Sequence, residues 1–281
     1  MSIRIAFIGA GRMATAIVRR LLKHGHYNAK EIACTCGSGN SGEKLAELTG
    51  IDYRTNIVPA ILEANTLVLA CKPQQLSTLD NSIVSAAQGK LVLSILAGTQ
   101  LSQLNAQFNT ARNIVRAMPN TPSQIGAGVT AYATQLPLSP EDQEIVATIL
   151  EPLGKSYEFE EHDIDAFTAL CGSGPAYVFE FAAALRDAAI NCGLDAHLSE
   201  SLAIDTLLGS AKLLAESKDT PEALRDAVTS PGGTTAAALE ILENNHFRKL
   251  IQQTLAAAKK RSLELSELKS QSSRAATNIE P

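Results

Sequence analysis

The sequence predicts an α/β fold, in which a doubly wound sheet is followed by an all-α domain. Two observations lead to this prediction. In the first two-fifths of the chain, short apolar runs alternate with segments whose apolar residues recur at helical spacing. After about residue 161 the strand-like runs stop, and long Ala- and Leu-rich helical patterns follow. Strand–helix alternation implies parallel strands joined by right-handed crossovers, and 281 residues fit two average domains.

Short apolar runs mark the predicted strands, which span residues 3–8, 32–35, 67–70, 91–94 and 113–117. Two of the runs, 67–70 and 91–94, are almost continuously apolar, as expected for parallel strands with both faces covered. Helical spacing appears between the strands over residues 13–21, 43–49 and 76–87. Regular structure is expected to stop after residue 117, because Pro119 and Pro122 follow closely.

The composition excludes several classes of protein. With 45% hydrophobic and 19% charged residues, the chain has enough apolar material for a core and too little charge for a disordered polymer. The net charge of −5 argues against nucleic acid as a partner, since a nucleic-acid binder needs a concentrated basic surface. No apolar stretch approaches the roughly 18 residues of a membrane span. We expect a cytoplasmic protein with neither nucleic-acid nor membrane partners.

The cysteines and histidines show no metal-binding pattern. Five cysteines are spread over a chain too large to need disulfides, so reduced thiols in the cytoplasm are expected. Cys34 and Cys36 form C-x-C without a second pair, which is typical of small residues in a strand rather than of a zinc site. No metal is predicted.

Four long helical patterns fill the second part of the chain, over residues 175–191, 198–216, 234–244 and 247–268. The first is apolar on most of its faces. A helix of this kind must be buried, and in so small a domain a second copy of the chain is the simplest partner. A homodimer through the helical domain is therefore predicted. Residues 270–281 are polar and are expected to be disordered.

The motif Gly9-Ala10-Gly11-Arg12-Met13-Ala14 is a G-x-G-x-x-A sequence between a predicted strand and a predicted helix. That context gives the pattern its meaning as a Rossmann-type dinucleotide site. Gly9 permits the tight turn, Gly11 lets the backbone approach a pyrophosphate, and Ala14 allows the helix to pack close to the sheet. The helix N-terminus offers free N–H groups to the phosphates. The alternative is a Gly-rich turn in an unrelated α/β fold.

The loop after the second predicted strand bears on which dinucleotide is bound. An NAD site usually has an acidic residue there, bonded to the ribose 2′-hydroxyl, but no acid occurs before Glu43. The loop carries neutral donors instead, with Lys44 nearby; they are Thr35, Ser38, Asn40 and Ser41. NADP(H) is favoured, NAD(H) is not excluded, and an ordinary polar loop is the alternative.

Two further turns follow predicted strands, at residues 70–73 and 95–98. Ligands in open α/β sheets lie beyond the carboxyl ends of the strands, so both turns are candidate walls for ribose and nicotinamide. Lys72 is either a catalytic residue or a solvated loop lysine.

A second anion site is predicted at residues 228–239, where a Gly-Gly loop leads into an Ala-rich helix. Unpaired N–H groups at a positive helix end would bind a small anion such as a carboxylate. The alternative is that Thr234 or Thr235 simply caps the helix. The loop at residues 171–177 starts another helix. Its pattern fits a contact with a ligand and a plain helix start equally well.

The sequence shows no convincing His–Asp pair, nucleophile elbow or carboxylate dyad near these loops. A dehydrogenase of alcohols needs a general base. Reduction of an imine needs less, because a C=N group can arrive already protonated, and a hydroxyl that hydrogen-bonds to the nitrogen is then enough.

Five motifs, in this order, resemble those of the pyrroline-5-carboxylate reductase family over residues 3–268. They are Phe7-Ile8-Gly9-Ala10-Gly11-Arg12-Met13-Ala14, Cys71-Lys72-Pro73, Arg116-Ala117-Met118-Pro119-Asn120-Thr121-Pro122, Gly172-Ser173-Gly174-Pro175-Ala176-Tyr177 and Ser230-Pro231-Gly232-Gly233-Thr234-Thr235. The resemblance implies hydride transfer from NAD(P)H to L-1-pyrroline-5-carboxylate, giving L-proline. It also implies homodimers through the helical domain, often assembled into decamers.

The same resemblance assigns site residues. The implied cofactor-binding residues are Ile8, Gly9, Ala10, Gly11, Arg12, Met13, Thr35, Ser38, Asn56, Ala70, Cys71, Lys72, Pro73 and Ala97. The implied substrate-binding residues are Met118, Pro119, Asn120, Ser230, Gly233, Thr234 and Thr235. The substrate would lie between the two domains, with its carboxylate at Ser230, Gly233 and Thr234 and its ring nitrogen at Thr235, the expected catalytic residue.

The resulting domain prediction has three parts. Residues 1–161 form a Rossmann-type dinucleotide-binding domain, residues 162–269 a helical dimerisation and substrate domain, and residues 270–281 a disordered tail. The chain departs from the family at Cys171, where Ser is common, and no role is carried over to Lys218 or Ala227.

Two other functions remain as alternatives. A β-hydroxyacid-type dehydrogenase would need a catalytic lysine in the second half, and the interior candidate Lys212 lacks the expected Gly-rich setting. A non-catalytic NADP-binding sensor or scaffold predicts a degenerate second-domain loop, whereas residues 230–235 look intact.

Overall fold

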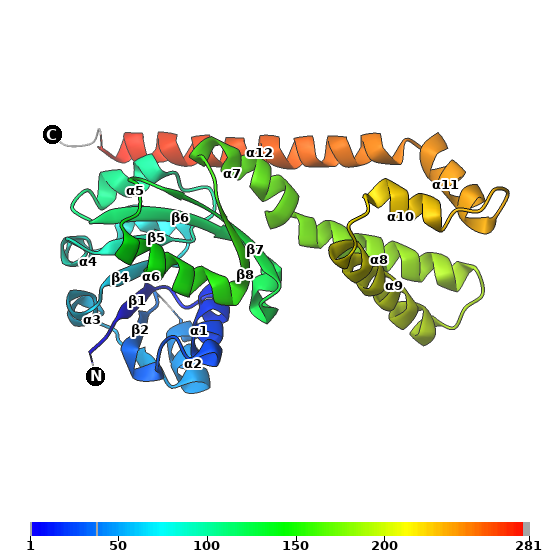
Figure 1. Ribbon diagram of the computed structural model, residues 1–281. Coiled ribbons are helices and arrows are strands. Elements are labelled where there is room, and N and C mark those ends of the chain that lie inside the picture. The colour runs from blue at the N-terminus through cyan, green and yellow to red at the C-terminus, as the bar shows by residue number, and fades with distance from the viewer. Residues whose placement is uncertain (1, 38, 278–281) are drawn as a thin grey trace. The chain divides into compact units, whose positions relative to one another are not determined.

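The computed structural model describes residues 2–37 and 39–277. The chain divides into two compact units, one made of residues 1–172 with 258–281 and the other of residues 173–257. Figure 1 labels most of the helices and strands of both.

The first unit is built on one sheet of eight strands in the order β3-β2-β1-β4-β5-β6-β7-β8. The strands are β1 (Ile5–Ile8), β2 (Ile32–Thr35), β3 (Asp52–Tyr53), β4 (Thr66–Leu69), β5 (Leu91–Ser94), β6 (Asn113–Pro119), β7 (Gly128–Thr134) and β8 (Gly154–Glu158). The strands from β3 to β6 in this order run parallel, β7 pairs antiparallel with β6, and β8 pairs parallel with β7. The predicted doubly wound α/β sheet is confirmed.

Helices cover both faces of this sheet, and each face has its own apolar core (Figure 1). The helices are α1 (Arg12–His24), α2 (Ser41–Thr49), α3 (Val58–Glu63), α4 (Asn81–Ala86), α5 (Leu101–Gln107), α6 (Pro140–Leu150) and α7 (Ile164–Phe167). One core joins the sheet to α1, α2 and α6, and the other joins it to α3, α4, α5 and α7. Strands β1, β2, β4 and β5 are buried at every position, which explains their continuous apolar runs.

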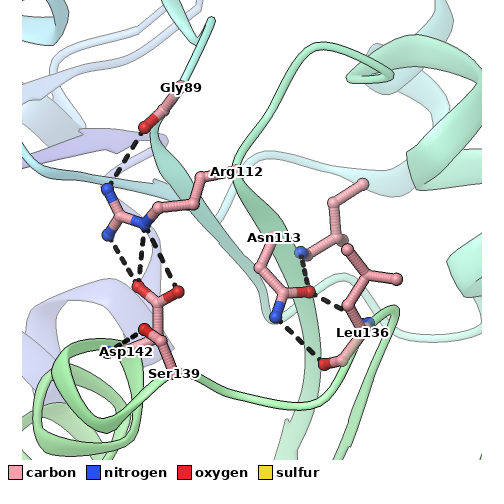
Figure 2. A network of polar contacts seen from close by, with 7 residues as sticks. Gly89, Arg112, Asn113, Leu136, Ser139 and Asp142 are labelled. Atoms are coloured by element: carbon pink, nitrogen blue, oxygen red, sulfur yellow. Dashed lines mark hydrogen bonds and ion pairs between the residues drawn. The ribbon is translucent and has the colours of Figure 1, made fainter.

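A network of polar side-chain contacts lies where β6 begins (Figure 2). The guanidinium of Arg112 binds the buried carboxylate of Asp142, at 2.6 Å from Nη2 to Oδ1, and also donates to the carbonyl of Gly89. Beside it, the Asn113 side chain exchanges hydrogen bonds with the backbone of Leu136. Since β6 runs parallel to its neighbours, this network lies at the amino edge of the parallel strands, away from the edge where ligands are expected.

The second unit is entirely helical, as predicted. It contains α8 (Gly174–Asn191), α9 (Ala196–Glu216), α10 (Pro221–Ala227), α11 (Thr234–Asn244) and the first part of α12 (Phe247–Thr277). Helices α8 and α9 pack against each other. Across residues 173–257, all of which the structure describes, only Ser199 and Ala203 are buried. Many large apolar side chains of this unit are exposed.

The structure differs from the sequence predictions in several places, and three of its strands, β3, β7 and β8, were not predicted. The two compact units divide between residues 172 and 173, so α7 and the π-helical turn Thr168–Gly172 belong to the sheet unit. The functional domains with a boundary between residues 161 and 162 stay a prediction. Residues 270–277, predicted to be disordered, continue α12, since neither Gly nor Pro occurs between Phe247 and Thr277. Residues 278–281 lie outside the described residues. Strand β6 extends through Met118 and Pro119, because both still pair with β7.

Candidate functional site

A pocket of about 490 Å³ opens at the carboxyl ends of β1 and β4. This is the topological switch point of the sheet, because β2 and β3 lie on one side of β1 while β4 and the later strands lie on the other. Such a switch point is where open α/β sheets bind ligands. The walls are the turns that follow β1, β2, β3 and β4, together with the connection from β4 into α4.

Gly9 fixes the turn after β1. Its N–H donates to the carbonyl of Thr35 at 2.8 Å, while the N–H of Ala70 donates to the carbonyl of Ile8 at 2.8 Å. Its φ of +110° lies in the left-handed region, and a Cβ at this position would collide with the backbone of Ala70 and Cys71. Both the local conformation and the close approach of β1 to β4 therefore require glycine.

Gly11 has no such structural reason to be glycine. It is the residue before α1, with an ordinary φ of −76°, and no side chain caps the helix. A Cβ at Gly11 would meet nothing within 4 Å. The residue lines the pocket, so the missing side chain leaves room beside the unpaired N–H groups of the first turn of α1. This arrangement fits the pyrophosphate of a dinucleotide.

No acidic side chain lines the pocket from the loop after β2. Thr35, Cys36, Gly37 and Ser41 form that wall, and the thiol of Cys36 accepts the N–H of Gly42 at 3.3 Å. Burial raises the pKa of the neighbouring Cys34 to about 12, so this thiol stays protonated. The usual partner of an NAD ribose 2′-hydroxyl is absent from this part of the described pocket.

Two charged residues line the pocket, Lys72 and Asp80. The Oδ1 atom of Asp80 accepts hydrogen bonds from the backbone and the hydroxyl of Ser82, each at 2.7 Å, and these bonds hold the pKa of the carboxyl below its usual value. Asp80 thereby caps α4.

The pocket brings together eight of the predicted cofactor residues. They are Ile8, Gly9, Ala10, Gly11, Thr35, Ala70, Cys71 and Lys72. Five others do not line it; they are Arg12, Met13, Asn56, Pro73 and Ala97. The side chain of Asn56 accepts the N–H of Val58 at 3.1 Å, and Ser38 lies outside the described residues.

Sequence reasoning missed one wall of the pocket. The missed residues are Thr55, Gln75, Thr78, Leu79, Asp80 and Ile83. Most come from residues 75–83, which helical spacing assigned to one continuous helix. The structure instead forms a 3-10 turn at Pro73–Thr78, followed by α4. The signal for this break was Asp80, a good N-cap residue in the middle of the predicted helix.

The predicted substrate residues Met118, Pro119 and Asn120 lie at the carboxyl end of β6. Asn120 is buried, and both ends of its amide are used within the fold. Its Oδ1 accepts the N–H of Val129 at 2.9 Å, and its Nδ2 donates to the carbonyl of Cys171 at 3.0 Å. Asn120 therefore holds β7 and the π-helical turn together, while Met118 is half-buried.

In the second unit, the loop 230–233 leads into α11 in an uncapped form. Gly232 has a φ of +70° and the N–H of Gly233 donates to the carbonyl of Ser230 at 3.0 Å. Gly233 is the N-cap residue and no side chain caps the helix. The alternative that Thr234 or Thr235 caps α11 is therefore wrong, because both lie within its first turn. The first N–H groups of the helix remain available to an anion.

Among the described residues, no group of three or more His, Cys, Asp or Glu side chains could hold a metal ion. None of the described helices is long and apolar enough to cross a membrane.

Comparison with known proteins identifies similar chains. The family described as "Pyrroline-5-carboxylate reductase dimerisation" matches residues 161–265, and the family "NADP oxidoreductase coenzyme F420-dependent" matches residues 4–98. A pyrroline-5-carboxylate reductase of Synechocystis is 38% identical over 94% of this chain and 99% of its own length. That of Arabidopsis thaliana is 33% identical over 95% of this chain and 96% of its own.

Solved structures give the same picture. A pyrroline-5-carboxylate reductase from Coxiella burnetii has a TM-score of 0.87 and 34% identity, with 95% of this chain and 99% of that chain covered. The Plasmodium falciparum pyrroline carboxylate reductase, solved with NADP bound, has a TM-score of 0.83 and 28% identity, with 94% and 98% covered.

Proposed function

The chain belongs to the pyrroline-5-carboxylate reductase family, and from this premise we propose that it reduces L-1-pyrroline-5-carboxylate to L-proline with NADPH. It is an oxidoreductase of that family. In the proposed reaction a C–H bond forms at C5 of the ring, and the electron pair of the C=N bond moves onto the ring nitrogen. That nitrogen, protonated in the iminium form, becomes the amine of proline. NADPH supplies the hydride.

Within the structure, the observation that carries the dinucleotide part of this proposal is Gly11. Neither its backbone conformation nor the surrounding side chains require glycine, and it stands in a pocket at the switch point of the sheet. The room beside it suits a pyrophosphate bound by the N-terminus of α1. Arg12 and Met13, the first two residues of α1, are proposed to bind the same pyrophosphate. Asn56, Pro73 and Ala97 are proposed to complete the site from positions next to the turns that follow β3, β4 and β5.

We assign NADPH rather than NADH to the site on the basis of the loop after β2. Its pocket wall consists of neutral side chains and backbone, and a carboxylate that would repel a 2′-phosphate is missing there. Thr35, Ser38 and Ser41 are the proposed hydrogen-bond donors to that phosphate. The relative with NADP bound supports this choice.

The substrate carboxylate is proposed to bind at the start of α11. The hydroxyl of Ser230 and the N–H groups of Gly233 and Thr234 would hold it, in keeping with an uncapped helix N-terminus. The hydroxyl of Thr235 would hydrogen-bond to the ring nitrogen. Met118, Pro119 and Asn120 are proposed to contact the ring.

The match to a dimerisation family and the exposed apolar side chains of α8 and α9 support a homodimer through the helical unit. Assembly of dimers into decamers is a further proposal, which sedimentation of the purified protein tests. Each of the five cysteines is described and free, which fits a reducing compartment, and we propose a cytoplasmic location.

The test is oxidation of NADPH by the purified protein with L-1-pyrroline-5-carboxylate, run beside NADH and beside a 2-hydroxy acid with NADP⁺. We expect imine-dependent oxidation that is faster with NADPH. Activity only with the hydroxy acid would replace the proposal by a β-hydroxyacid-type dehydrogenase. NADPH binding without any turnover would favour a sensor.

A further inference from the structure

Arg116 is a buried cation in the middle of β6. Only 4% of its surface is exposed. It lies between Ser94 of β5 and Ala133 of β7 in the register of the sheet. A guanidinium in such a place needs a negative partner, because an unpaired buried charge is strongly unfavourable.

Glu161 is that partner, and one of its oxygens serves two donors. Its Oε1 accepts from Nη1 of Arg116 at 2.8 Å and from the backbone N–H of Leu101 at 2.6 Å. Leu101 is the first residue of α5, so its N–H has no acceptor within the helix. A single carboxylate oxygen therefore ties together β6, the start of α5, and the 3-10 turn Glu161–Asp163 that precedes α7.

Both partners of Glu161 border the ligand edge of the sheet. Leu101 directly follows the loop 95–100, which begins at the carboxyl end of β5 and carries Ala97. Arg116 stands two residues before Met118, and side chains two residues apart in a strand share a face. Thr99 is buried, and the N–H of Gln100 donates to the side chain of Gln103 at 3.0 Å. These two hydrogen bonds, from the N–H groups of Gln100 and Leu101, fix the C-terminal end of the loop.

We propose that Glu161 is a positioning residue for hydride transfer. Through one oxygen it holds the loop 95–100 and the end of β6 at a fixed separation, and so sets the place of the nicotinamide relative to the substrate ring. This proposal rests on the proposed function. Glu161 is also the first residue of the segment that matches the dimerisation family. Its hydrogen bond with the N–H of Leu101 therefore links the end of the loop 95–100 to the start of that segment.

The test compares Glu161→Gln with Asp142→Asn in the full-length protein. Glutamine keeps an acceptor for the N–H of Leu101 but removes the charge that faces Arg116. Asp142 is the control, because it also forms an ion pair with an arginine at β6 in which one of the two partners is buried, and it lies at the opposite edge of the sheet (Figure 2). If Glu161→Gln fails to fold, the double variant Arg116→Met with Glu161→Gln removes both charges and takes its place.

The measurements are single-turnover hydride transfer and the amplitude of that turnover. For Glu161→Gln we expect a rate constant roughly tenfold lower at full amplitude, because a hydrogen bond between two charged groups is replaced by a weaker one to a neutral amide. Asp142→Asn should lower the melting temperature and leave the rate constant unchanged. A lower amplitude with a wild-type rate constant would mean a merely structural role and would overturn the proposal. So would an unchanged rate at full amplitude. Failure of the proposed function itself would appear separately, as a wild-type protein without imine turnover.

Discussion

The two units of the chain use similar amino acids in opposite ways. In the sheet unit, four strands are buried at every position and two apolar cores cover the two faces. In the helical unit only Ser199 and Ala203 are buried, and large side chains such as Phe179 and Leu208 are exposed by 63% and 51%. The difference teaches that the sheet unit supplies its own core, whereas the helical unit needs another surface to cover it.

The match of residues 161–265 to a dimerisation family supports oligomerisation through the helical unit, and we propose that these exposed faces form the interface. Stability of the first unit should therefore be independent of protein concentration, and that of the second should rise with it. The first two of the four predictions below test this difference, and the other two test the chemistry and the ligands assigned to each unit.

The largest effect is expected in the core of the sheet unit. Leu69→Ala removes a fully buried side chain of β4 and should lower the free energy of unfolding by about 2–5 kcal/mol, since a cavity remains. Urea unfolding at several protein concentrations measures it, and the loss should be the same at each. Leu62→Ala is the control, because that side chain on α3 is 62% exposed and its removal should change little. Equal losses in both variants would contradict the idea of a self-sufficient core.

The next largest effect is expected in the affinity of the dimer that the helical unit is proposed to form. Phe179→Asp places a charge on the exposed apolar face of α8 and should weaken dimerisation by about 2–4 kcal/mol, or roughly thirtyfold to a thousandfold in Kd. Light scattering after size exclusion reports the mass. Leu48→Asp on α2, where the side chain is 60% exposed in the sheet unit, should leave the mass unchanged. An intact dimer in the Phe179 variant would show that α8 lies outside the interface.

A smaller effect concerns the chemistry assigned to the second unit. Thr235→Ala should lower kcat by an amount equivalent to about 1.5–3 kcal/mol, the value of one hydrogen bond to a charged group. Thr234→Ala is the control, because it keeps the backbone N–H proposed for the carboxylate and removes only a hydroxyl. Steady-state kinetics with NADPH in excess distinguishes the two variants, and equal kcat values would remove Thr235 from the mechanism.

The smallest effects are expected in the KM values of two variants, which test the assignment of NADPH to the sheet unit and of the imino acid to the helical unit. Gly11→Ala fills open space beside the cofactor pocket and should raise KM for NADPH several-fold, about 1 kcal/mol, at unchanged melting temperature. Gly233→Val, at the start of α11, should instead raise KM for the imino acid. Should either variant change the KM of the other ligand alone, the assignment of ligands to units is reversed.

Much of the sheet unit was predictable because its signals are local. The turn around Gly9 and Gly11 is enclosed by a strand and a helix whose periods can be read within about a dozen residues. The same holds for α11, which begins at Thr234 as predicted. The wall formed by Leu79 and Ile83 was not predictable in the same way, because their helical spacing is equally compatible with a buried helix face.

By itself, the sequence determined the alternation of strands and helices along the first part of the chain, the glycine turn, the helical second half and the family to which the protein belongs. These depend on local periodicity and on motifs contiguous in the chain. Only the tertiary structure decided that the Asn120 amide hydrogen-bonds to the backbone of Val129 and Cys171. It also decided that the Glu161 carboxylate accepts the N–H of Leu101, 60 residues away in the sequence. Contacts of that kind depend on how strands and helices pack in three dimensions, and no pattern of neighbouring residues records them.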